Sequence, residues 1–511
     1  MQAQQELALR DEADKLELAR AMLERARPRV RYADLLVEEV TKVEYTRLVG
    51  GDEVVKPFSR KGAVQLRLVG EEGRHLSVSF GLLPEAELLP GIDYALEALA
   101  LQEPDPRYGL APVPNAERVR YGVASPGDLS SEDVLLAFDT LAREVDQVCT
   151  RVADGGTVEV RTELWCYAQV EEKLVLDTEG LFKTQVLPST FLQMTAIARD
   201  PSTGKTTRQR TRLGDTQPLG FFFADGHPAH GLRRDFVEGL SDCTRRAVAQ
   251  QKGRRLSGAE LSALTHYVLA PTAMVFVHEA EGHNFEADLI QQGTSGLFHK
   301  DGCPADDPFA SALVDVWDGQ ILKADGGFDE TAGFGTHFID DEGVELKPVR
   351  LVQGGRITGK LHNRETAHHF GEKPNGHGFS ELGDKRLVRM TNTYLLPAGQ
   401  EGWCSSLEDL IGDVTFGVFL EGSLGGAVSR DGMSTTIQFG RVIRDGRLTD
   451  EVLLPANLSV VTRDSLKSVE GFAGPLRLDG VGFCGKGQTK TVTEGGPVTK
   501  LRATPAITLG F

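Results

Sequence analysis

Apolar residues recur at helical spacing in several stretches of the first half of the chain. Leu16, Ala19 and Leu23 form one such stripe, which Pro28 is expected to end. Charged residues fill the positions between them, as on the solvent side of a surface helix. Patterns of this kind predict helices over residues 11–27, 84–101, 130–152, 235–252 and 257–264.

Between these helices apolar and polar residues alternate, which indicates half-buried strands. Strands are predicted over residues 33–40, 43–48, 63–69, 75–80, 157–170, 174–176, 181–187 and 191–199. Residues 63–69 and 75–80 are expected to pair as a hairpin. Residues 102–117 contain four prolines and are predicted to be a linker or a surface loop. The polar residues 200–216 are predicted to be exposed.

Turn-forming pairs replace helices after residue 283. These pairs are Asp318-Gly319, Asp325-Gly326, Glu342-Gly343, Gly354-Gly355 and Asp445-Gly446. Short strands are predicted between them, over residues 349–353, 357–361, 441–443 and 448–453. We therefore expect an α+β fold with two domains. Residues 1–240 would combine antiparallel sheets with helices, with a further division left open near residues 102–128, and residues 241–511 would form a Gly-rich, β-dominated domain.

The net negative charge of the chain argues against polyanions as binding partners. Its 511 residues carry a net charge of −18, which argues against nucleic acid or an anionic membrane as the main partner. Residues 1–26 lack the apolar core of a secretory signal, and the longest apolar run, residues 267–277, is too short to span a bilayer. The six cysteines are scattered without a C-x-x-C pair. A cytoplasmic setting is therefore expected, with neither a disulfide framework nor a zinc ribbon.

The strongest chemical signal is the stretch His278-Glu279-Ala280-Glu281-Gly282-His283. Two imidazoles and a carboxylate are the usual parts of a catalytic zinc site. The familiar spacing H-E-x-x-H places both imidazoles on one helical face, whereas a spacing of five turns the second by about 140° on a straight α-helix. A π-bulge would nearly realign them, and Gly282 would ease that distortion. We therefore predict an irregular helical turn over residues 278–283; the alternative is a chance match on a solvated helix.

Four motifs follow one another in the second half of the chain. They are the block at residues 278–283 with Glu286-Ala287-Asp288, the turn Asp340-Asp341-Glu342-Gly343, the segment Arg389-Met390-Thr391-Asn392-Thr393-Tyr394, and the late segment Gly482-Phe483-Cys484-Gly485-Lys486-Gly487-Gln488. Together they resemble the TldD/PmbA family of metallopeptidases, also called modulators of DNA gyrase, and within it the TldD-type subunit. The likeness is tight from about residue 270 onward, whereas residues 81–120 and 200–215 depart from the family pattern.

The resemblance implies a zinc site with one ion per chain. His278 and His283 would be two ligands, and the family pattern implies that Cys484 is the third. Considered without the family, Cys484 would be a small buried hydrophobe. Local rivals for the third position are Glu286, Asp288 and His299. Glu286 and Asp288 are preferred as acceptors that orient the imidazoles, and Glu279 is expected to be the general base.

Two further sets of residues are candidates for binding substrate. Gly425 and Gly426 lie in the Gly-rich segment 417–432, which forms either tight turns and bulges or backbone open to an extended peptide. Asn392 and Tyr394 lie either in the cleft or in a core strand.

The resemblance implies a peptidase that acts on short or unfolded peptides. Its partner would be a second copy of the chain or a related subunit that lacks the metal motif, in a dimer that encloses the site. Two alternatives stay open: a maturation protease for one leader or modified peptide, and a non-catalytic regulatory or binding subunit. The intact set of His278, Glu279, His283 and Cys484 favours an enzyme.

Overall fold

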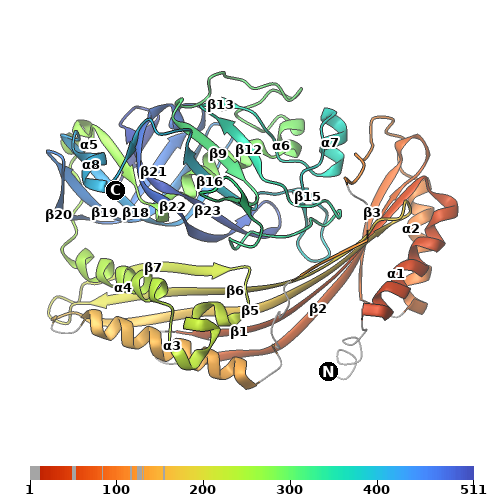
Figure 1. The fold of residues 1–511 in the computed structure, drawn as a ribbon, viewed down its shortest axis with the longest axis horizontal. Coiled ribbons are helices and arrows are strands. Elements are labelled where there is room, and N and C mark those ends of the chain that lie inside the picture. Colours follow the sequence, from red (N-terminus) through yellow and green to blue (C-terminus); the bar gives the residue numbers. More distant parts are fainter. Residues whose placement is uncertain are drawn as a thin grey trace.

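The fold is mixed α+β, as the sequence predicts, and is dominated by two large sheets (Figure 1). The computed structural model describes residues 12–48, 53–82, 85–114, 118–122, 129, 132–153 and 156–511. The first half of the chain builds one sheet and the second half builds the other. The long strands of the first sheet pass beneath the second sheet and rise at the far end of the molecule.

The first sheet has seven strands in the order β3-β2-β1-β5-β6-β4, and β7 also pairs with β6. They are β1 (Tyr32–Arg47), β2 (Glu53–Val69), β3 (His75–Gly81), β4 (Val119–Gly122), β5 (Glu159–Asp177), β6 (Phe182–Arg199) and β7 (Thr206–Asp215). Neighbours run antiparallel except β4 and β6. The predicted hairpin is confirmed, with Leu66 of β2 opposite Val78 of β3.

Three predicted interruptions of these strands are wrong. The strand pairs expected within residues 33–48, 157–176 and 181–199 are each one continuous strand, β1, β5 and β6. Pro188 fits inside β6 because this strand pairs with β4 only at residues 183–186 and with β7 only from residue 190. One side of β6 is therefore unpaired at the position that lacks an N–H. The polar residues 206–215, predicted as exposed, form the strand β7.

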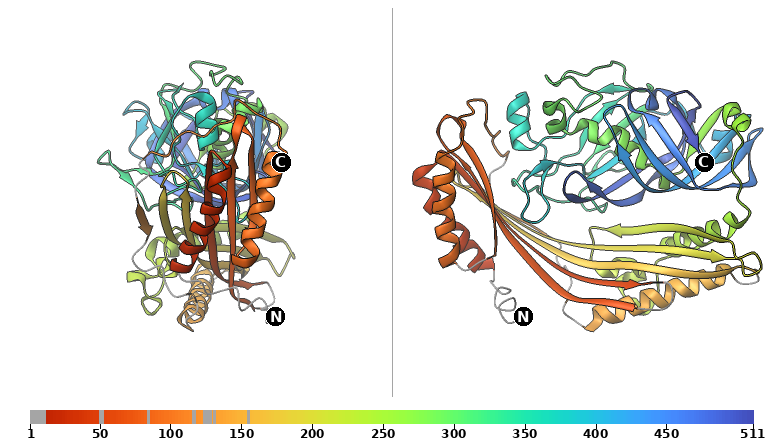
Figure 2. Two further views of the ribbon diagram at one scale, coloured as in Figure 1. Left: turned by 90° about the vertical axis from the view of Figure 1, so that its right-hand side faces the viewer. Right: turned by 180° about the vertical axis from the view of Figure 1, so that it is seen from behind.

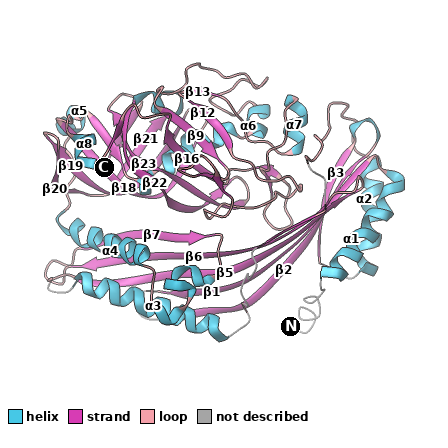
Figure 3. Ribbon diagram, viewed as in Figure 1, coloured by secondary structure: helices cyan, strands magenta, loops and turns pink. Residues whose placement is uncertain are grey.

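Four long helices cover this sheet at its two ends (Figures 2 and 3). They are α1 (Glu12–Ala26), α2 (Glu85–Ala100), α3 (Glu132–Ala153) and α4 (Arg234–Ala249). With the short α5 (Gly258–Ala263), they confirm the five predicted helices, although residues 11, 84, 130 and 131 of these predictions lie outside the described residues. In the described part of the chain, no helix is both long and apolar enough to cross a membrane.

Alternation along β5 gives the first sheet two different faces. Leu164 and Cys166 pack with the core residues of α3 and α4. Trp165 and Tyr167 point the other way and contact Phe483, which precedes Cys484 in the second sheet. The period-2 pattern of one strand thus provides both a helix-covered core and a contact layer for the second half of the chain.

The second sheet has thirteen strands, with the main order β13-β12-β9-β16-β23-β8-β18-β19-β21-β24. Its strands are β8 (His266–Leu269), β9 (Val314–Asp318), β12 (Val349–Gln353), β13 (Arg356–Ile357), β16 (Asn392–Pro397), β17 (Trp403–Cys404), β18 (Phe416–Val428), β19 (Gly432–Arg444), β20 (Arg447–Leu453), β21 (Ala456–Val461), β22 (Val469–Gly485), β23 (Thr489–Arg502) and β24 (Ile507–Gly510). Short two-stranded pairs join β10 (Ile321–Leu322) to β11 (Phe328–Asp329) and β14 (Gly378–Phe379) to β15 (Leu387–Val388). The helices of this half are α6 (Ala287–Gln292), α7 (Arg364–Phe370), α8 (Leu407–Ile411) and α9 (Thr462–Ser465).

The glycines of the predicted turn pairs do mark turns. Gly319, Gly326, Gly343, Gly354 and Gly446 all adopt positive φ, which L side chains rarely do. The strand predicted at residues 357–361 is shorter than expected, since β13 ends at residue 357. The strand predicted at residues 441–443 is part of the longer β19.

A buried network of charges joins the two halves of the chain. Arg67 of β2 binds Asp34 of β1 and lies 2.5 Å from Glu342 of the Asp340–Gly343 motif, and all three side chains are at most 7% exposed. Arg386 binds the second oxygen of Asp34 at 2.6 Å. Burial raises the pKa of Asp34, but Arg386 and Arg67 outweigh burial and hold it well below its ordinary value. Asp34 is therefore charged, and Arg67 bridges it to Glu342.

The division predicted at residue 240 stays a prediction. The helix α4 crosses this position, and Phe236, Leu240, Cys243 and Ala247 all lie in the core beneath the first sheet. We propose that the boundary falls after α4, because a break at residue 240 would split a single packed helix.

The charge network generates a stability prediction. Arg67→Leu would leave Glu342 and Asp34 buried with one cation fewer, so we expect the free energy of unfolding at pH 7 to fall by about 3–5 kcal/mol in chemical denaturation. Arg356→Leu is the matched control, because Arg356 is 62% exposed and pairs with the exposed Asp307. It should cost about 1 kcal/mol or less. Equal, small losses for both variants would contradict the role assigned to the network.

Candidate metal centre

The two histidines of the H-E-x-x-x-H motif lie on an irregular helical turn. Residues Val277–Glu281 form a π-helical turn, and Gly282–Phe285 continue as a 3-10 helix. The irregular turn predicted from the spacing is therefore confirmed. It brings the rings of His278 and His283 to a centroid distance of 5.3 Å. The extra residue of a π turn compensates for the spacing of five.

Gly282 serves this turn through its small size and not through backbone freedom. Its φ of −52° and ψ of −53° are ordinary right-handed helix values. A Cβ at this position would lie 3.3 Å from Cγ of Met390 and closer still to its sulfur. Glycine therefore lets the turn pack directly against Met390, which lies two residues before β16.

Cys484 reaches the same point from near the end of the chain. It lies on β22, is buried, and has its Sγ 3.3 Å from Nε2 of His283. One ligand atom each of His278, His283 and Cys484 lie within 4.8 Å of one another. Among the residues that the structure describes, no other group of three His, Cys, Asp or Glu side chains comes together in this way.

The chemistry of these three side chains fits a zinc ion. Nδ1 of His278 is buried and makes no hydrogen bond within the described chain, so it lacks the partner that buried polar atoms normally have. Burial raises the pKa of Cys484, but His283 and His278 outweigh burial and hold it well below its usual value. Burial lowers the pKa of His278, and Cys484 raises it to about 9. One thiolate and two imidazoles are ligands that zinc prefers.

Glu286 is positioned to orient His283. Its Oε2 lies 2.8 Å from Nδ1 of His283 and 3.2 Å from Nζ of Lys486. Burial raises the pKa of Glu286, but Lys486 and His283 outweigh burial and lower it to about 2. The charged carboxylate can therefore accept the Nδ1–H of His283, which leaves Nε2 facing Cys484.

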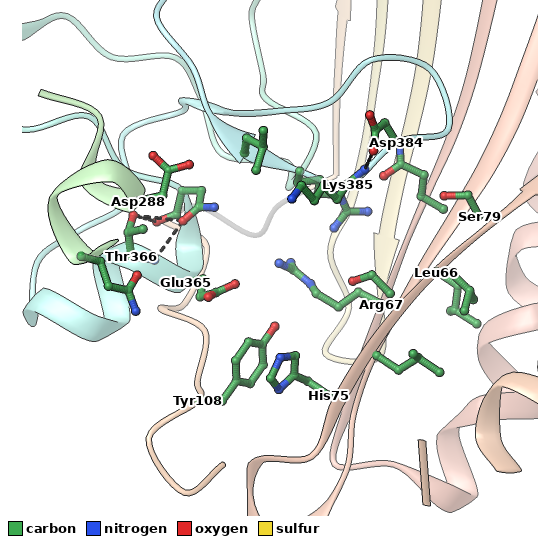
Figure 4. A pocket seen from close by; sticks show the side chains of 18 of the residues that line it. Leu66, Arg67, His75, Ser79, Tyr108, Asp288, Glu365, Thr366, Asp384 and Lys385 are labelled. Atoms are coloured by element: carbon green, nitrogen blue, oxygen red, sulfur yellow. Dashed lines mark hydrogen bonds between the residues drawn. The ribbon is translucent and has the colours of Figure 1, made fainter. Parts of the chain in front are cut away.

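The prediction that Asp288 also orients an imidazole is wrong. Among the described residues, its carboxylate instead accepts hydrogen bonds from Nζ of Lys486 at 2.6 Å and from the N–H of Val388 at 3.2 Å. Asp288 acts on the histidines only through Lys486, which also contacts Glu286. Figure 4 shows Asp288 in the wall of a cavity of about 410 Å³ that Arg67 also lines. This cavity lies between the two halves of the chain.

The rivals for the third ligand position are engaged elsewhere. His299 is exposed and lies outside the group of three. Glu286 is bound to His283, and Asp288 is bound to Lys486. Of the four candidates, Cys484 is the one whose side chain joins both histidines.

Glu279 lies beside this group with its carboxylate unbonded. In the described chain it accepts no hydrogen bond, and its Oε2 is 4.0 Å from Nε2 of His283. Gly426 of β18 makes room for it, since a Cβ there would lie 2.9 Å from Cδ of Glu279 and 3.0 Å from its Oε1. Gly425 has a φ of +102° and open space around it. Gly425 thus lies in a β-bulge of β18, and Gly426 leaves room for the side chain of Glu279.

Asn392 and Tyr394 are core residues, so their prediction as cleft residues is wrong. Both are fully buried. The amide of Asn392 donates to the carbonyl of Gly319 at 3.0 Å and to Oγ1 of Thr336 at 2.8 Å. The hydroxyl of Tyr394 donates to the carbonyl of Gln320 at 2.8 Å. These bonds hold β16 in the sheet and leave neither side chain free for a substrate.

Two charged residues near the histidines were missed, because neither belongs to a motif. Glu494 lies on β23, where it is one residue of an alternating strand pattern. Burial raises its pKa to about 7; His278 lowers it and Glu279 raises it. Arg212 of β7 interacts electrostatically with Glu494 and donates from Nε to Gln193 at 3.0 Å. Only the folded chain brings these residues to the candidate metal centre.

Comparison with known proteins places these residues in a family. Residues 264–497, which hold all three candidate ligands, match the family model of the PmbA/TldA metallopeptidase C-terminal domain. Residues 264–497 thus carry the C-terminal domain of the TldD/PmbA family. A metalloprotease of Methanothermobacter thermautotrophicus is 40% identical over 233 residues, which cover 45% of this chain and 46% of that protein. A zinc metalloprotease TldD homolog of Saccharolobus solfataricus is 27% identical over 328 residues, or 61% of this chain and 64% of that protein.

The whole fold is similar to that of a solved family member. TldE of Thermococcus kodakarensis superposes with a TM-score of 0.69 over 97% of this chain and 100% of that one, at 14% identity. A likeness at such low identity concerns the fold alone. The chain spans about half the length of the curated relatives that it matches at 33–40% identity. The activity of this chain therefore has to be argued from the site itself.

The geometry predicts which cysteine holds a metal. Cys484→Ser should lower the zinc content of purified, dialysed protein from about one ion per chain to well below half, because a neutral hydroxyl replaces the thiolate. Cys303→Ser is the control, since Cys303 is exposed in a loop. Elemental analysis by mass spectrometry gives both numbers. Full zinc content in Cys484→Ser would show that the third ligand is another residue.

Proposed function

We propose that this chain is a zinc-dependent peptidase that hydrolyses short or unfolded peptides. The observation that carries the proposal is the unbonded carboxylate of Glu279, which lies beside three converging ligand atoms. A carboxylate next to a metal is the usual general base of metal-assisted hydrolysis. The names of the relatives, metalloprotease and zinc metalloprotease, support the same chemistry.

Each residue of the site has a distinct task in this proposal. Zinc held by His278, His283 and Cys484 would act as a Lewis acid that makes water more acidic and polarises a peptide carbonyl. Glu279 would take a proton from the attacking water and deliver it to the departing amine. Glu286 would keep the ring of His283 in place through the Nδ1–H.

A peptide is the substrate class that suits the neighbouring backbone. β18 pairs with β8 only through residues 417–420, so its edge beyond that point has no strand partner among the described residues. Residues 424–428 are exposed, and Gly426 lies against Glu279. An extended peptide could add its main-chain hydrogen bonds to such an edge.

The alternative functions differ in what they need from the site. Maturation of one leader or modified peptide would use the same residues, so it differs only in substrate. A regulatory subunit would not need a carboxylate free of hydrogen bonds beside the three ligand atoms, and we therefore favour catalysis. The predicted assembly, with a second copy or with a related subunit that lacks the metal motif, stays a prediction.

The role of Glu279 can be separated from metal binding. Glu279→Gln should retain about one zinc per chain and lose about 10²- to 10⁴-fold in kcat on an unfolded peptide, because the amide cannot take a proton. Glu281→Gln is a control from the same turn; Glu281 accepts a hydrogen bond from Ser465 at 2.9 Å, which an amide oxygen can also accept. It should hydrolyse peptides at close to the wild-type rate. Undiminished hydrolysis by Glu279→Gln would exclude Glu279 as the base.

The space above Glu279 yields a second activity prediction. In Gly426→Ala the new methyl group would collide with the Glu279 carboxylate and displace it. A displacement of about 1 Å can cost about 10²-fold in rate, so we expect a comparable loss of hydrolysis with zinc retained. Gly239→Ala is the control, because nothing lies within 4 Å of its added Cβ on α4. Equal activity of the two variants would mean that Glu279 does not depend on this space.

A further inference from the structure

Glu494 is a buried residue whose carboxylate makes no hydrogen bond and no close ion pair in the described chain. The residue is 7% exposed, and it forms neither a hydrogen bond nor an ion pair with any described residue. Buried carboxylates are normally paired with a cation or with hydrogen-bond donors. His278 and Arg212 are the positive charges that act on Glu494. Neither forms an ion pair with it within 4.0 Å, so the carboxylate lacks a cation in direct contact.

Glu494 and Cys484 face the same side of the β22–β23 hairpin. The register runs without a bulge from Gly480, which lies opposite Glu494, to Gly485. Because side chains alternate along a strand, Gly480, Gly482 and Cys484 share one face with Glu494. The two glycines leave this stretch of β22 without side chains between the candidate ligand Cys484 and the carboxylate.

Gly480 clears the space that Glu494 occupies. A Cβ at this position would lie 2.7 Å from Cδ of Glu494, closer than real Cβ atoms approach. Gly426 clears space for Glu279 in the same way. The site thus contains two carboxylates, each facing a glycine and each without a hydrogen bond in the described chain.

Arg212, which acts on Glu494 less strongly than His278 does, does not neutralise it by direct contact. Arg212 comes within 3.6 Å of a Cβ built on Gly482, but it forms no ion pair with Glu494 within 4.0 Å. Its guanidinium is held by Gln193 and lines a cavity of about 580 Å³. Asp479 and Val481, the neighbours of Gly480, line the same cavity. A ligand in this space would meet Arg212 and lie close to the strand position opposite Glu494.

We propose that Glu494 is a specificity-determining residue that binds a positively charged group of the peptide, either its amino terminus or a Lys or Arg side chain. This inference rests on the proposed peptidase function. An ammonium or guanidinium group beside Glu494 would give the carboxylate a cation in direct contact and would also reduce the repulsion between Glu494 and Glu279. Charge pairing in a desolvated pocket discriminates strongly against neutral analogues, because these leave the carboxylate unpaired.

The experiment measures peptide binding in a background that does not turn over. Zinc-loaded Glu279→Gln protein is titrated with three fluorescent peptides of one backbone: one with a free amino terminus, one acetylated and neutral, and one acetylated with a single Lys whose position is varied. We expect at least one charged peptide to bind about tenfold more tightly than the neutral one. The peptide that does so identifies the amino terminus or the side chain as the recognised group.

Adding Glu494→Gln should abolish this preference, leave binding of the neutral peptide unchanged and leave the zinc content unchanged. Gly480→Ala, which displaces the carboxylate but keeps its charge, should weaken the preference as well. Glu408→Gln, on the exposed surface of α8, is the control and should keep the preference.

Three results would overturn the assignment. They are equal binding of charged and neutral peptides by the parent protein, no binding of any charged peptide, and an equal loss for all peptides in Glu494→Gln. A purely structural role in holding His278 would instead lower the zinc content.

Failure of the role assigned to Glu494 can be told apart from failure of the proposed peptidase function. Wild-type protein that cleaves neutral and charged peptides equally well would refute the role of Glu494 and leave the peptidase intact. Wild-type protein that cleaves no peptide, but whose binding preference depends on Glu494, would refute the peptidase and leave this inference standing.

Discussion

The meeting of one thiol and two imidazoles inside an apolar core is the constraint on which the rest of the structure depends. Val277, Ala280, Cys484 and Val492 belong to the same buried hydrophobic cluster. Polar atoms in such a place have little contact with bulk water, so they pair with one another or bind a cation. The π-helical turn and the Glu286–Lys486 pair both serve this one point, since each fixes the direction of a histidine.

Three glycines around this point act through volume. Gly282, Gly426 and Gly480 have no positive φ, yet a side chain at each would collide with Met390, Glu279 and Glu494 respectively. Gly343, in the Asp340–Gly343 turn, is different, because its φ of +75° requires glycine for the backbone itself. The glycines of this chain therefore serve two separate purposes, positive φ in turns and free space at the site.

Local features of the fold could be predicted from the sequence, whereas contacts between distant segments could not. Helical periodicity placed the five helices, and the spacing of five between His278 and His283 was sufficient to predict the irregular turn. Continuous strands were missed where charges such as Lys173 are buried by partners like Asp341, 168 residues away. Cys484 lies 201 residues from His283, so spacing alone could not select it and the family resemblance was needed.

The sequence also could not show which polar side chains belong to the core and which belong to the site. Asn392 and Tyr394 lie in a motif, yet their hydrogen bonds to the backbone make them part of the core. Glu494 lies in no motif, and nothing in its alternating strand distinguishes it from a solvent-facing residue. Which polar residue is satisfied and which is left unpaired depends on neighbours from other strands, and these are known only from the fold.

The π-helical turn also bears on how metal signatures arise. A π turn is an α-helix that has gained one residue, and the gain is absorbed locally while the flanking backbone keeps its course. Loss of Ala280 alone would convert His278-Glu279-x-x-x-His283 into the shorter H-E-x-x-H spelling, with both imidazoles again on one helical face. The two spacings thus differ by a single codon.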